Sequence, residues 1–317
     1  MRAAVRARSV PRHRHRELST RTRKERIMRV GIAGLGSMGG GMCRRLAERG
    51  FDVVAYDADA GVAAAAAEHP GVRAAESVAD LAAPVVVTML PDGAAVRQVT
   101  DELLPHLAAG SLIVDTGSSA PEDTLDLGRA AAAHRVAVVD APVSGSPAAA
   151  RAGELTLMAA GEPGDVERAE QVLGALGRVY RVGPAGAGHA LKALNNLLSA
   201  VNLAAVAEVM LAGRAFGLEP AAMLEVINAS TGRNHASQTK LPDHVLPGTF
   251  DSGFALRLML KDIRIGTSLL DSAGGPAAFG HACRDLWEKA HDELPAGADN
   301  VEVVRWLENA SGRELRA

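Results

Sequence analysis

The clearest candidates for chemistry are a lysine and an asparagine in the run GAGHALKALNN, residues 186–196. Lys192 and Asn196 are four residues apart, so they project from one face if the segment is helical. A lysine whose pKa is lowered by burial can act as a general acid or base. Such pairs are common on solvated helix faces, but the surrounding leucines make this segment broadly apolar, and polar residues there need partners. We therefore predict that Lys192 and Asn196 are catalytic residues.

A second candidate lies in the run DAPVSGSPAAARAGEL, residues 140–155. Ser144 and Gly145 directly follow an apolar stretch, so a hydroxyl and backbone N–H groups are presented together. This arrangement can bind a carboxylate. Taken without its context, the pair is equally consistent with an ordinary turn.

A glycine-rich run near the start of the apolar sequence predicts a dinucleotide site. The segment MRVGIAGLGSMG, residues 28–39, carries Gly34, Gly36 and Gly39 between a short apolar stretch and residues with helical spacing. The first glycine permits a tight turn, the second lets the backbone approach a pyrophosphate, and the third lets the helix pack on the strand. The helix N-terminus then faces the phosphates. An ordinary glycine turn is the alternative.

An acidic residue follows at the distance that such a site requires. Asp57 ends a second apolar stretch, 52–56, about twenty residues after the glycines, where a carboxylate can accept hydrogen bonds from ribose hydroxyls. The same carboxylate repels a 2′-phosphate. The sequence therefore favours NAD as the cofactor, with NADP as the alternative.

The rest of the chain alternates short apolar runs with alanine-rich segments, which predicts an α/β fold with a Rossmann-type doubly wound parallel sheet. Further strands are expected at 84–89, 111–114, 136–141, 155–160 and 178–182, with a helix around 164–173 between the last two. Loops at the carboxyl ends of such strands contact ligands, here 90–93, 115–119 and 140–147. From residue 188 the strand signals vanish, and a long helix over 189–216 leads into further helices with breaks at 217–220, 242–248 and 274–276. We expect a cofactor domain over 28–187 and an all-α C-terminal domain over 188–317.

Composition excludes several other classes. The 317 residues include two cysteines, Cys43 and Cys283, which cannot form a disulfide framework and point to a cytoplasmic setting. The histidines form no metal-binding motif, so no metal is predicted. Aromatic residues are too few for a stacking surface, so no nucleic-acid partner is expected, and no apolar run is long enough to predict a membrane span.

Residues 1–27 differ from the rest of the chain. Nine Arg and one Lys against two Glu give this segment a charge of +8, while the remainder carries about −11. The expectation is a disordered or mis-annotated extension ahead of Met28. Targeting and nucleic-acid contact are the alternatives.

These motifs, in this order, resemble the β-hydroxyacid dehydrogenase family, which includes 3-hydroxyisobutyrate dehydrogenase. The resemblance implies that Lys192 is the catalytic acid/base with Asn196 beside it, and that Ser144 and Gly145 bind substrate. It also implies that Lys261 contacts the cofactor and that Asp262 supports Lys261, both within the run FALRLMLKD, residues 254–262. The cofactor-binding residues expected from the motifs and the resemblance are Gly34, Leu35, Gly36, Ser37, Met38, Gly39, Asp57, Leu90, Pro91, Ala95, Ser118 and Lys261.

The sequence departs from this family at the substrate loop. The family usually has two glycines after the substrate serine, whereas here Ser146 takes the second position and is predicted to line the substrate site. Its side chain narrows the loop or changes its polarity, which leaves the substrate open. Arg233, Asn234 and Lys240 are candidate determinants of substrate choice, and surface charges are the equal alternative.

The predicted function is hydride transfer between NAD(P) and a small β-hydroxyacid like 3-hydroxyisobutyrate, or its semialdehyde. An imine reductase and a non-catalytic NAD-binding protein are the alternatives, and Lys192 argues against the first. The expected partner is a small carboxylate-bearing substrate. If Leu286, Trp287 and Trp306 are exposed, they predict a homodimer or homotetramer, and the alternative is that they complete the core.

Overall fold

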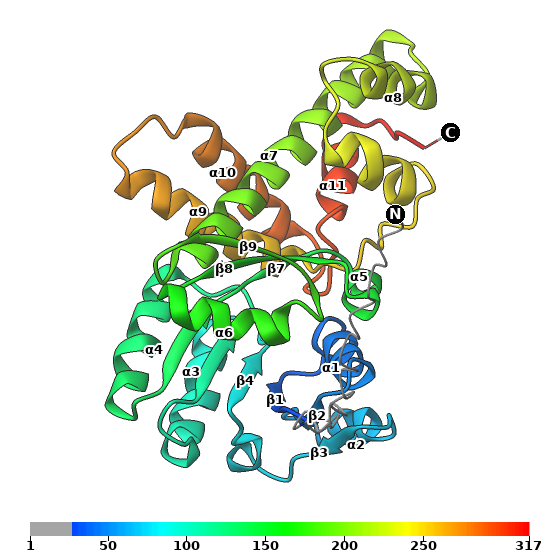
Figure 1. Ribbon diagram of the computed structural model, residues 1–317. Coiled ribbons are helices and arrows are strands. Elements are labelled where there is room, and N and C mark those ends of the chain that lie inside the picture. Colours follow the sequence, from blue (N-terminus) through cyan, green and yellow to red (C-terminus); the bar gives the residue numbers. More distant parts are fainter. Residues whose placement is uncertain (1–26, 317) are drawn as a thin grey trace, which may run out of the picture.

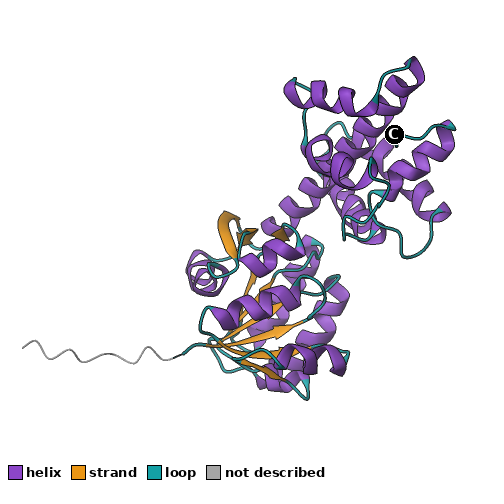
Figure 2. Ribbon diagram, turned by 90° about the vertical axis from the view of Figure 1, so that its right-hand side faces the viewer, coloured by secondary structure: helices purple, strands orange, loops and turns teal. Residues whose placement is uncertain are grey.

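The computed structural model describes residues 27–316 and has two parts, a sheet flanked by helices and a group of helices (Figures 1 and 2). The expectations for residues 1–26 therefore lie outside the described residues. The last strand ends at Gly183, and the long helix α7, Ala187–Phe216, leads from the sheet into the helical part.

A nine-stranded sheet forms the first part, in the order β3-β2-β1-β4-β5-β6-β8-β7, with β9 paired to β8. Its strands are β1 (Arg29–Ala33), β2 (Asp52–Tyr56), β3 (Val72–Ala74), β4 (Val85–Thr88), β5 (Leu112–Asp115), β6 (Ala137–Asp140), β7 (Val143–Ser144), β8 (Leu155–Ala160) and β9 (Gly177–Gly183). From β1 the successive strands are added on one side as β2 and β3, and then on the other side as β4, β5 and β6. The switch falls between β1 and β4, which is where a doubly wound sheet binds its ligand.

Helices cover both faces of this sheet (Figure 2). They are α1 (Gly39–Glu48), α2 (Ala60–Ala67), α3 (Gly93–Leu103), α4 (Pro121–Ala133), α5 (Pro147–Ala152) and α6 (Pro163–Leu173), with short 3₁₀ turns η1 (Val78–Leu81) and η2 (Leu104–His106). Because both faces are covered, the central strands are apolar throughout rather than alternating, and all four residues of β4 and of β5 are buried. The continuous Val and Ile runs in the sequence follow from this burial.

The sheet differs from the expected all-parallel arrangement at one side. Strands β1 to β6 are parallel, but β8 runs antiparallel to both β6 and β7, and β9 is parallel to β8. The reversal has a local cause, because β8 follows β7 after only the short segment 145–154, whereas a connection between parallel strands needs about a dozen residues or more. Strand β3, strand β7 and helix α5 were not predicted from the sequence, and each of them is short.

Six helical elements make up the second part, beginning with α7. The others are α8 (Pro220–Ala229), the π-helix η3 (Ala236–Val245), α9 (Leu256–Ser272), α10 (Ala278–Glu293) and α11 (Glu302–Ser311). The expected break at 242–248 is displaced, because Pro242 lies inside η3 and the chain leaves the helix only after Val245. Pro242 has no N–H to donate to the carbonyl oxygen of Ser237 five residues earlier, and that oxygen accepts from the Asn228 amide at 2.9 Å instead.

Helix α7 is 30 residues long and starts and ends at glycines in the left-handed region, Gly186 (φ 88°) and Gly217 (φ 99°). By length and composition it could cross a membrane, but half of its apolar stretch is buried within this fold. It packs against α9, α10 and α11, and at its other end against β8 and β9. These contacts account for its apolar character as the central helix of the helical part.

The three apolar residues of α10 and α11 expected to be exposed complete the core instead. Trp287 is completely buried in the core of the helical part, and Leu286 and Trp306 pack against that core. The large apolar side chains that are exposed lie elsewhere, chiefly Phe216 at the end of α7 and Phe279 at the start of α10, which are 85% and 84% exposed. The sequence pattern could not distinguish the buried tryptophan from the exposed phenylalanines, since all of them lie on helices with apolar stripes.

Candidate active site

The glycine-rich loop joins β1 to α1 with the geometry of a nucleotide-binding turn. Gly34 has a φ of +90°, and its N–H donates to the carbonyl oxygen of Tyr56 at 2.9 Å. A Cβ at Gly39 would overlap the carbonyl oxygen of Gly34, so the first turn of α1 can pack against the loop only without a side chain there. Met42 and Leu46 then anchor α1 in the core.

The middle glycine faces open space. A Cβ added at Gly36 would meet no atom within 4 Å, in contrast to Gly34 and Gly39. The surface of the loop above the N-terminus of α1 is thus free for a ligand that approaches the backbone closely. This cradle fits the pyrophosphate of a dinucleotide, which would accept hydrogen bonds from the free N–H groups at the helix start.

Asp57 lies where the sequence predicted it, beside this loop at the end of β2. One carboxylate oxygen accepts from the Leu35 N–H at 2.7 Å, and the other accepts from the Asp59 N–H at 3.0 Å. The carboxylate is therefore fixed next to the loop and carries remaining acceptor capacity for hydroxyl groups. Asp59 adds a second negative charge near the same place, and it also caps α2.

The loops after β4 and β5 meet the helical part through Lys261 of α9. Its ammonium donates to the carbonyl oxygen of Pro91 at 3.0 Å and also to that of Ser118. Leu90 and Pro91 directly precede α3, whose first turn is capped by Asp92 through the Ala95 N–H at 2.9 Å. The predicted residues of both loops are thus gathered at the carboxyl edge of the sheet beside Lys261.

Asp262 ties the two parts together at this edge. Its side chain is buried and accepts from the Ser118 hydroxyl at 2.6 Å and from the Asn196 amide nitrogen at 2.6 Å. The Lys261 ammonium lies 3.2 Å from the same carboxylate. The resemblance implied that Asp262 supports Lys261, and the structure shows that the same carboxylate also joins a loop of the sheet part to α7. Asn196 is thereby held in a single orientation.

Lys192 lies one helical turn before Asn196 on the same face of α7. Burial lowers the pKa of its ammonium, the charge of Asp262 opposes this shift, and the charge of Lys261 adds to it. Within residues 27–316 the ammonium has no hydrogen-bond or ion-pair partner. A desolvated amine without a fixed partner is available to exchange a proton with a ligand.

The predicted substrate loop follows β7. Gly145 has a φ of +144°, which a side chain would strain, and a Cβ there would press on Leu155 at 2.9 Å. The hydroxyl of Ser146 accepts from the Ala149 N–H at 3.2 Å and so caps helix α5. Ser146 therefore has a structural task that explains its presence, while Ser144 is half-buried at the end of its strand.

A buried polar cluster beneath the start of α7 was missed from the sequence. Asp140 at the end of β6 accepts from the Gly186 N–H at 2.9 Å and the His189 N–H at 3.0 Å, and burial raises the pKa of its carboxyl. His189 is buried as well, with Nδ1 at 2.6 Å from the Thr124 hydroxyl and Nε2 at 3.5 Å from Asp115. The cluster therefore fixes the first turn of α7, which comes just before Lys192. The position of Asp140 at a strand end was the available signal.

The three candidate specificity residues in segment 228–240 have different surroundings. Arg233 is exposed, and Asn234 is used in a turn, where it exchanges hydrogen bonds with Ser237. Lys240 differs from both, because burial lowers the pKa of its ammonium to about 8. It donates to the Asn300 side-chain oxygen at 2.8 Å, and the charge of Lys192 lowers its pKa further, so the two ammonium groups are close enough to repel.

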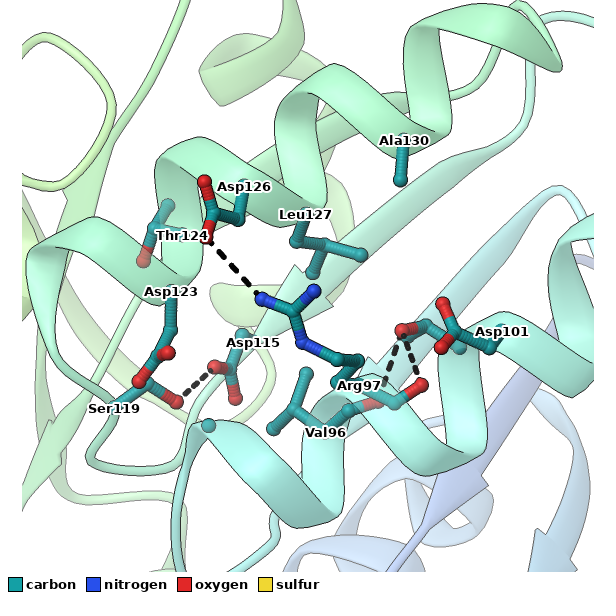
Figure 3. A pocket seen from close by; sticks show the side chains of 12 residues that line it. Val96, Arg97, Asp101, Asp115, Ser119, Asp123, Thr124, Asp126, Leu127 and Ala130 are labelled. Carbon is teal, nitrogen blue, oxygen red and sulfur yellow. Dashed lines mark hydrogen bonds and ion pairs between the residues drawn. The ribbon is translucent and has the colours of Figure 1, made fainter.

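A separate acidic pocket lies between α3 and α4 (Figure 3). Arg97 reaches across it to Asp126 at 3.3 Å, and Asp115 accepts from the Ser119 hydroxyl at 2.8 Å on its floor. None of the predicted catalytic, substrate or cofactor residues lines this pocket. Four carboxylates there disfavour an anionic ligand, so we do not place the active site in it. Within residues 27–316, no group of three or more His, Cys, Asp or Glu side chains is arranged to hold a metal ion.

A dinucleotide-binding sheet joined to a helical part that carries a desolvated lysine is the architecture of a pyridine-nucleotide-dependent oxidoreductase. Residues 29–183 match the family model described as the NAD binding domain of 6-phosphogluconate dehydrogenase. Residues 186–307 match the model described as NAD-binding of NADP-dependent 3-hydroxyisobutyrate dehydrogenase. The chain belongs to the 3-hydroxyisobutyrate dehydrogenase family.

Individual relatives agree with this assignment. The chain is 38% identical to 2-(hydroxymethyl)glutarate dehydrogenase of Eubacterium barkeri, over 91% of this chain and 97% of the relative. Its structure is similar to 3-hydroxyisobutyrate dehydrogenase of Mycobacterium tuberculosis with L-serine, at a TM-score of 0.81 and 30% identity, covering 89% and 99% of the two chains. An imine reductase variant of Myxococcus stipitatus shares 18% identity at a TM-score of 0.60, which reflects the fold alone.

Proposed function

We propose that this protein is an NAD(P)-dependent dehydrogenase that acts on the CH–OH group of a small β-hydroxyacid, with Lys192 as the general acid/base. The observation that carries the proposal is the desolvated Lys192 ammonium beside an Asn196 fixed by Asp262, close to the loops that Lys261 contacts. Family membership supports the same reaction class.

In the oxidation direction, the neutral Lys192 amine takes the proton of the substrate hydroxyl while a hydride leaves the carbon that bears this hydroxyl. The bound nicotinamide supplies the hydride acceptor. Asn196 donates the amide hydrogen that does not go to Asp262 to the substrate oxygen and keeps that oxygen in line with Lys192. Ser144 and the Gly145 N–H bind the substrate carboxylate. In reduction, the Lys192 ammonium returns the proton to the forming alkoxide.

We further propose that NAD is the preferred cofactor, because the carboxylates of Asp57 and Asp59 both lie at the ribose end of the cradle. In this assignment residues 28–187 bind the cofactor, with Gly34, Leu35, Gly36, Ser37, Met38 and Gly39 at the phosphates. Residues 188–317 contribute the catalytic side chains and the contacts of a homodimer or homotetramer. The exposed Phe216 and Phe279 support such an interface, and the two buried free cysteines support a cytoplasmic location.

The test is an absorbance assay at 340 nm with NAD and NADP against 3-hydroxyisobutyrate, 3-hydroxypropionate, 4-hydroxybutyrate, glycerate, L-threonate, L-serine and 2-(hydroxymethyl)glutarate. We expect NAD reduction with at least one β-hydroxyacid. Lys192→Ala should abolish this turnover and leave NAD binding, followed by protein fluorescence, nearly unchanged. Turnover of Lys192→Ala at a near-normal rate would remove the assignment, and NAD binding without turnover of any substrate would favour a non-catalytic role.

A further inference from the structure

A second desolvated lysine stands next to the catalytic one. Lys240 is half-buried on the π-helix η3, which packs against α7. Its pKa is lowered mainly by burial and further by the charge of Lys192, whereas Lys192 itself responds to Lys261 and Asp262. Lys192 therefore lies within electrostatic reach of both Lys261 and Lys240.

Lys240 forms no ion pair in the part of the chain that the structure describes. The negative charge of Asp299 raises the pKa of Lys240, but the oxygens of Asp299 accept from the Ser252 hydroxyl at 2.6 Å and from backbone N–H groups, including that of Gly253 at 2.7 Å, rather than from the ammonium. Asn300 provides one neutral acceptor for an ammonium that has three hydrogens. A desolvated cation with free donors and no ion pair is unfavourable unless a ligand supplies the negative charge.

The position of Lys240 is built rather than incidental. The buried Ser237 hydroxyl donates to the Asn228 side-chain oxygen at 2.7 Å, and the Asn228 amide nitrogen donates back to the Ser237 carbonyl at 2.9 Å. This exchange anchors the first turn of η3 to α8. At the other side, Asn300 is itself buried and held by bonds to Ser252 and to the Phe254 carbonyl, at 2.7 and 2.9 Å. The ammonium is thus presented from a rigid frame.

We propose that Lys240 binds a second carboxylate of the substrate, so that the protein acts on dicarboxylic β-hydroxyacids. This inference rests on the proposed function and adds the substrate class. One carboxylate is held by Ser144 and Gly145, the hydroxyl faces Lys192 and Asn196, and the second carboxylate pairs with Lys240 on the side away from the cofactor. A single ammonium with few neighbouring N–H donors suits a carboxylate better than a phosphate, which proteins bind with several donors or with arginine.

The test compares substrates that differ in the second charge. 2-(Hydroxymethyl)succinate and 2-(hydroxymethyl)glutarate carry it, the 5-amide of the glutarate replaces it with a neutral group of similar size, and 3-hydroxyisobutyrate lacks it. For the wild type we expect kcat/KM for the better diacid to exceed that for the amide by about tenfold or more, mostly through KM. A phosphorylated β-hydroxyacid is the additional arm, and a preference for it would overturn the assignment of a carboxylate.

Three variants separate the charge of Lys240 from general damage. Lys240→Met removes the charge and keeps the length, Lys240→Arg restores the charge, and Lys289→Met makes the same substitution at an exposed lysine of α10. We expect Lys240→Met to lower kcat/KM for the diacid about tenfold while changing it less than threefold for the amide and the monoacid. Lys240→Arg should recover part of the loss. Equal losses on all substrates, or no selective loss, would overturn the proposal.

The pH profile gives an independent readout. Lys240 is charged below its pKa of about 8 and neutral above it, so preference for the diacid over the amide should be present at pH 7 and should disappear as the pH passes through about 8 to 9. The charge of Asp299 raises the pKa of Lys240 and that of Lys192 lowers it, and His235 lies close enough for the charge of Lys240 to lower the pKa of its imidazole. A preference that is constant from pH 6.5 to 9.5 would contradict the role of Lys240.

Binding without turnover distinguishes failure of this inference from failure of the proposed function. Titration calorimetry with glutarate and with butyrate, in the presence of NAD, needs no reaction. We expect glutarate to bind the wild type at least about tenfold more tightly than butyrate, and Lys240→Met to lose the difference. If monoacids are oxidised but glutarate shows no advantage, the dicarboxylate assignment is wrong while the dehydrogenase assignment stands. If glutarate binds through Lys240 and no hydroxyacid is oxidised, the carboxylate site at Lys240 stands and the dehydrogenase assignment is wrong.

Discussion

The two glycines of the nucleotide loop should respond in opposite ways to the same methyl group. Gly36 is not among the residues with a positive φ, and a Cβ there would meet no protein atom within 4 Å. Gly36→Ala should therefore leave the free energy of unfolding unchanged or raise it by up to about 1 kcal/mol, because alanine restricts the unfolded chain. At Gly39 the same Cβ would overlap the Gly34 carbonyl oxygen and touch Met89. Forcing the helix away from the loop should cost about 1–3 kcal/mol.

Cofactor affinity should show the reverse order. A methyl group at Gly36 occupies the space that a pyrophosphate must enter, so at least one hydrogen bond from the backbone to a charged phosphate is lost. Such a bond contributes about 1.5–3 kcal/mol, which corresponds to a rise in the Kd for NAD of about tenfold or more. Gly39→Ala acts through the packing of α1, and its effect on the Kd should be no larger than its effect on stability.

The assay is thermal unfolding with and without NAD, together with the Kd from protein fluorescence. Without NAD, Gly36→Ala should unfold within about 2 °C of the wild type and Gly39→Ala about 2–10 °C lower. At a NAD concentration about one hundred times the wild-type Kd, the wild type gains about 2.7 kcal/mol, and Gly36→Ala should gain at least about 1.4 kcal/mol less. A wild-type Kd for Gly36→Ala would refute the placement of the pyrophosphate over this loop.

Three further perturbations test the catalytic edge. Because Lys192 must be neutral to accept a proton and its pKa lies below 10.5, kcat/KM for oxidation of a monoacid should rise with pH and reach a plateau below that value; a plateau only above pH 10.5 would contradict desolvation of the amine. Asp262→Asn removes the charge that raises the Lys192 pKa and places an amide opposite the Asn196 amide, so the rising limb should move to lower pH while unfolding becomes easier by about 1–3 kcal/mol. An unshifted pH profile in a folded Asp262→Asn protein would argue against their coupling. Asp57→Ser removes the negative charge at the ribose end and should raise the ratio of kcat/KM with NADP to that with NAD by about tenfold, whereas an unchanged ratio would mean that another group sets cofactor preference.

Local sequence patterns predicted the elements that carry the site, because strands buried on both faces of a sheet appear in the sequence as continuous apolar runs. Strand β2 begins and ends at the predicted residues, and so does β8, while α7 begins two residues before its predicted start. Strands β2 and β8 are largely buried, and α7 is bounded by glycines. The same reasoning failed where apolar residues occur on helices with two usable faces, as for Trp287, which the pattern could not distinguish from an exposed residue.

The site was predictable where chemistry depends on sequence spacing and not where it depends on contacts between distant segments. Lys192 and Asn196 are four residues apart, so their shared face follows from helical periodicity. Lys240 and Asn300 are sixty residues apart, and no local pattern shows that they meet. The lowered pKa of Lys240 arises from this burial in the tertiary structure. Sequence reasoning therefore could not rank Lys240 above the exposed Arg233 as a determinant of substrate choice.

The unbroken course of α7 makes it a lever arm between the two ends of the molecule. Lys192 and Phe216 lie on the same helix, separated by about 36 Å at 1.5 Å per residue. A tilt of about 5° pivoting at Phe216 would displace Lys192 by about 3 Å, and a misplacement of about 1 Å can reduce turnover a hundredfold. Proton transfer thus tolerates tilts of only about 1–2°, so the contacts with α9, α10 and α11 that hold the direction of the helix also set the rate at the substrate. The turnover number should consequently depend on side chains along the helix that never approach the reacting atoms.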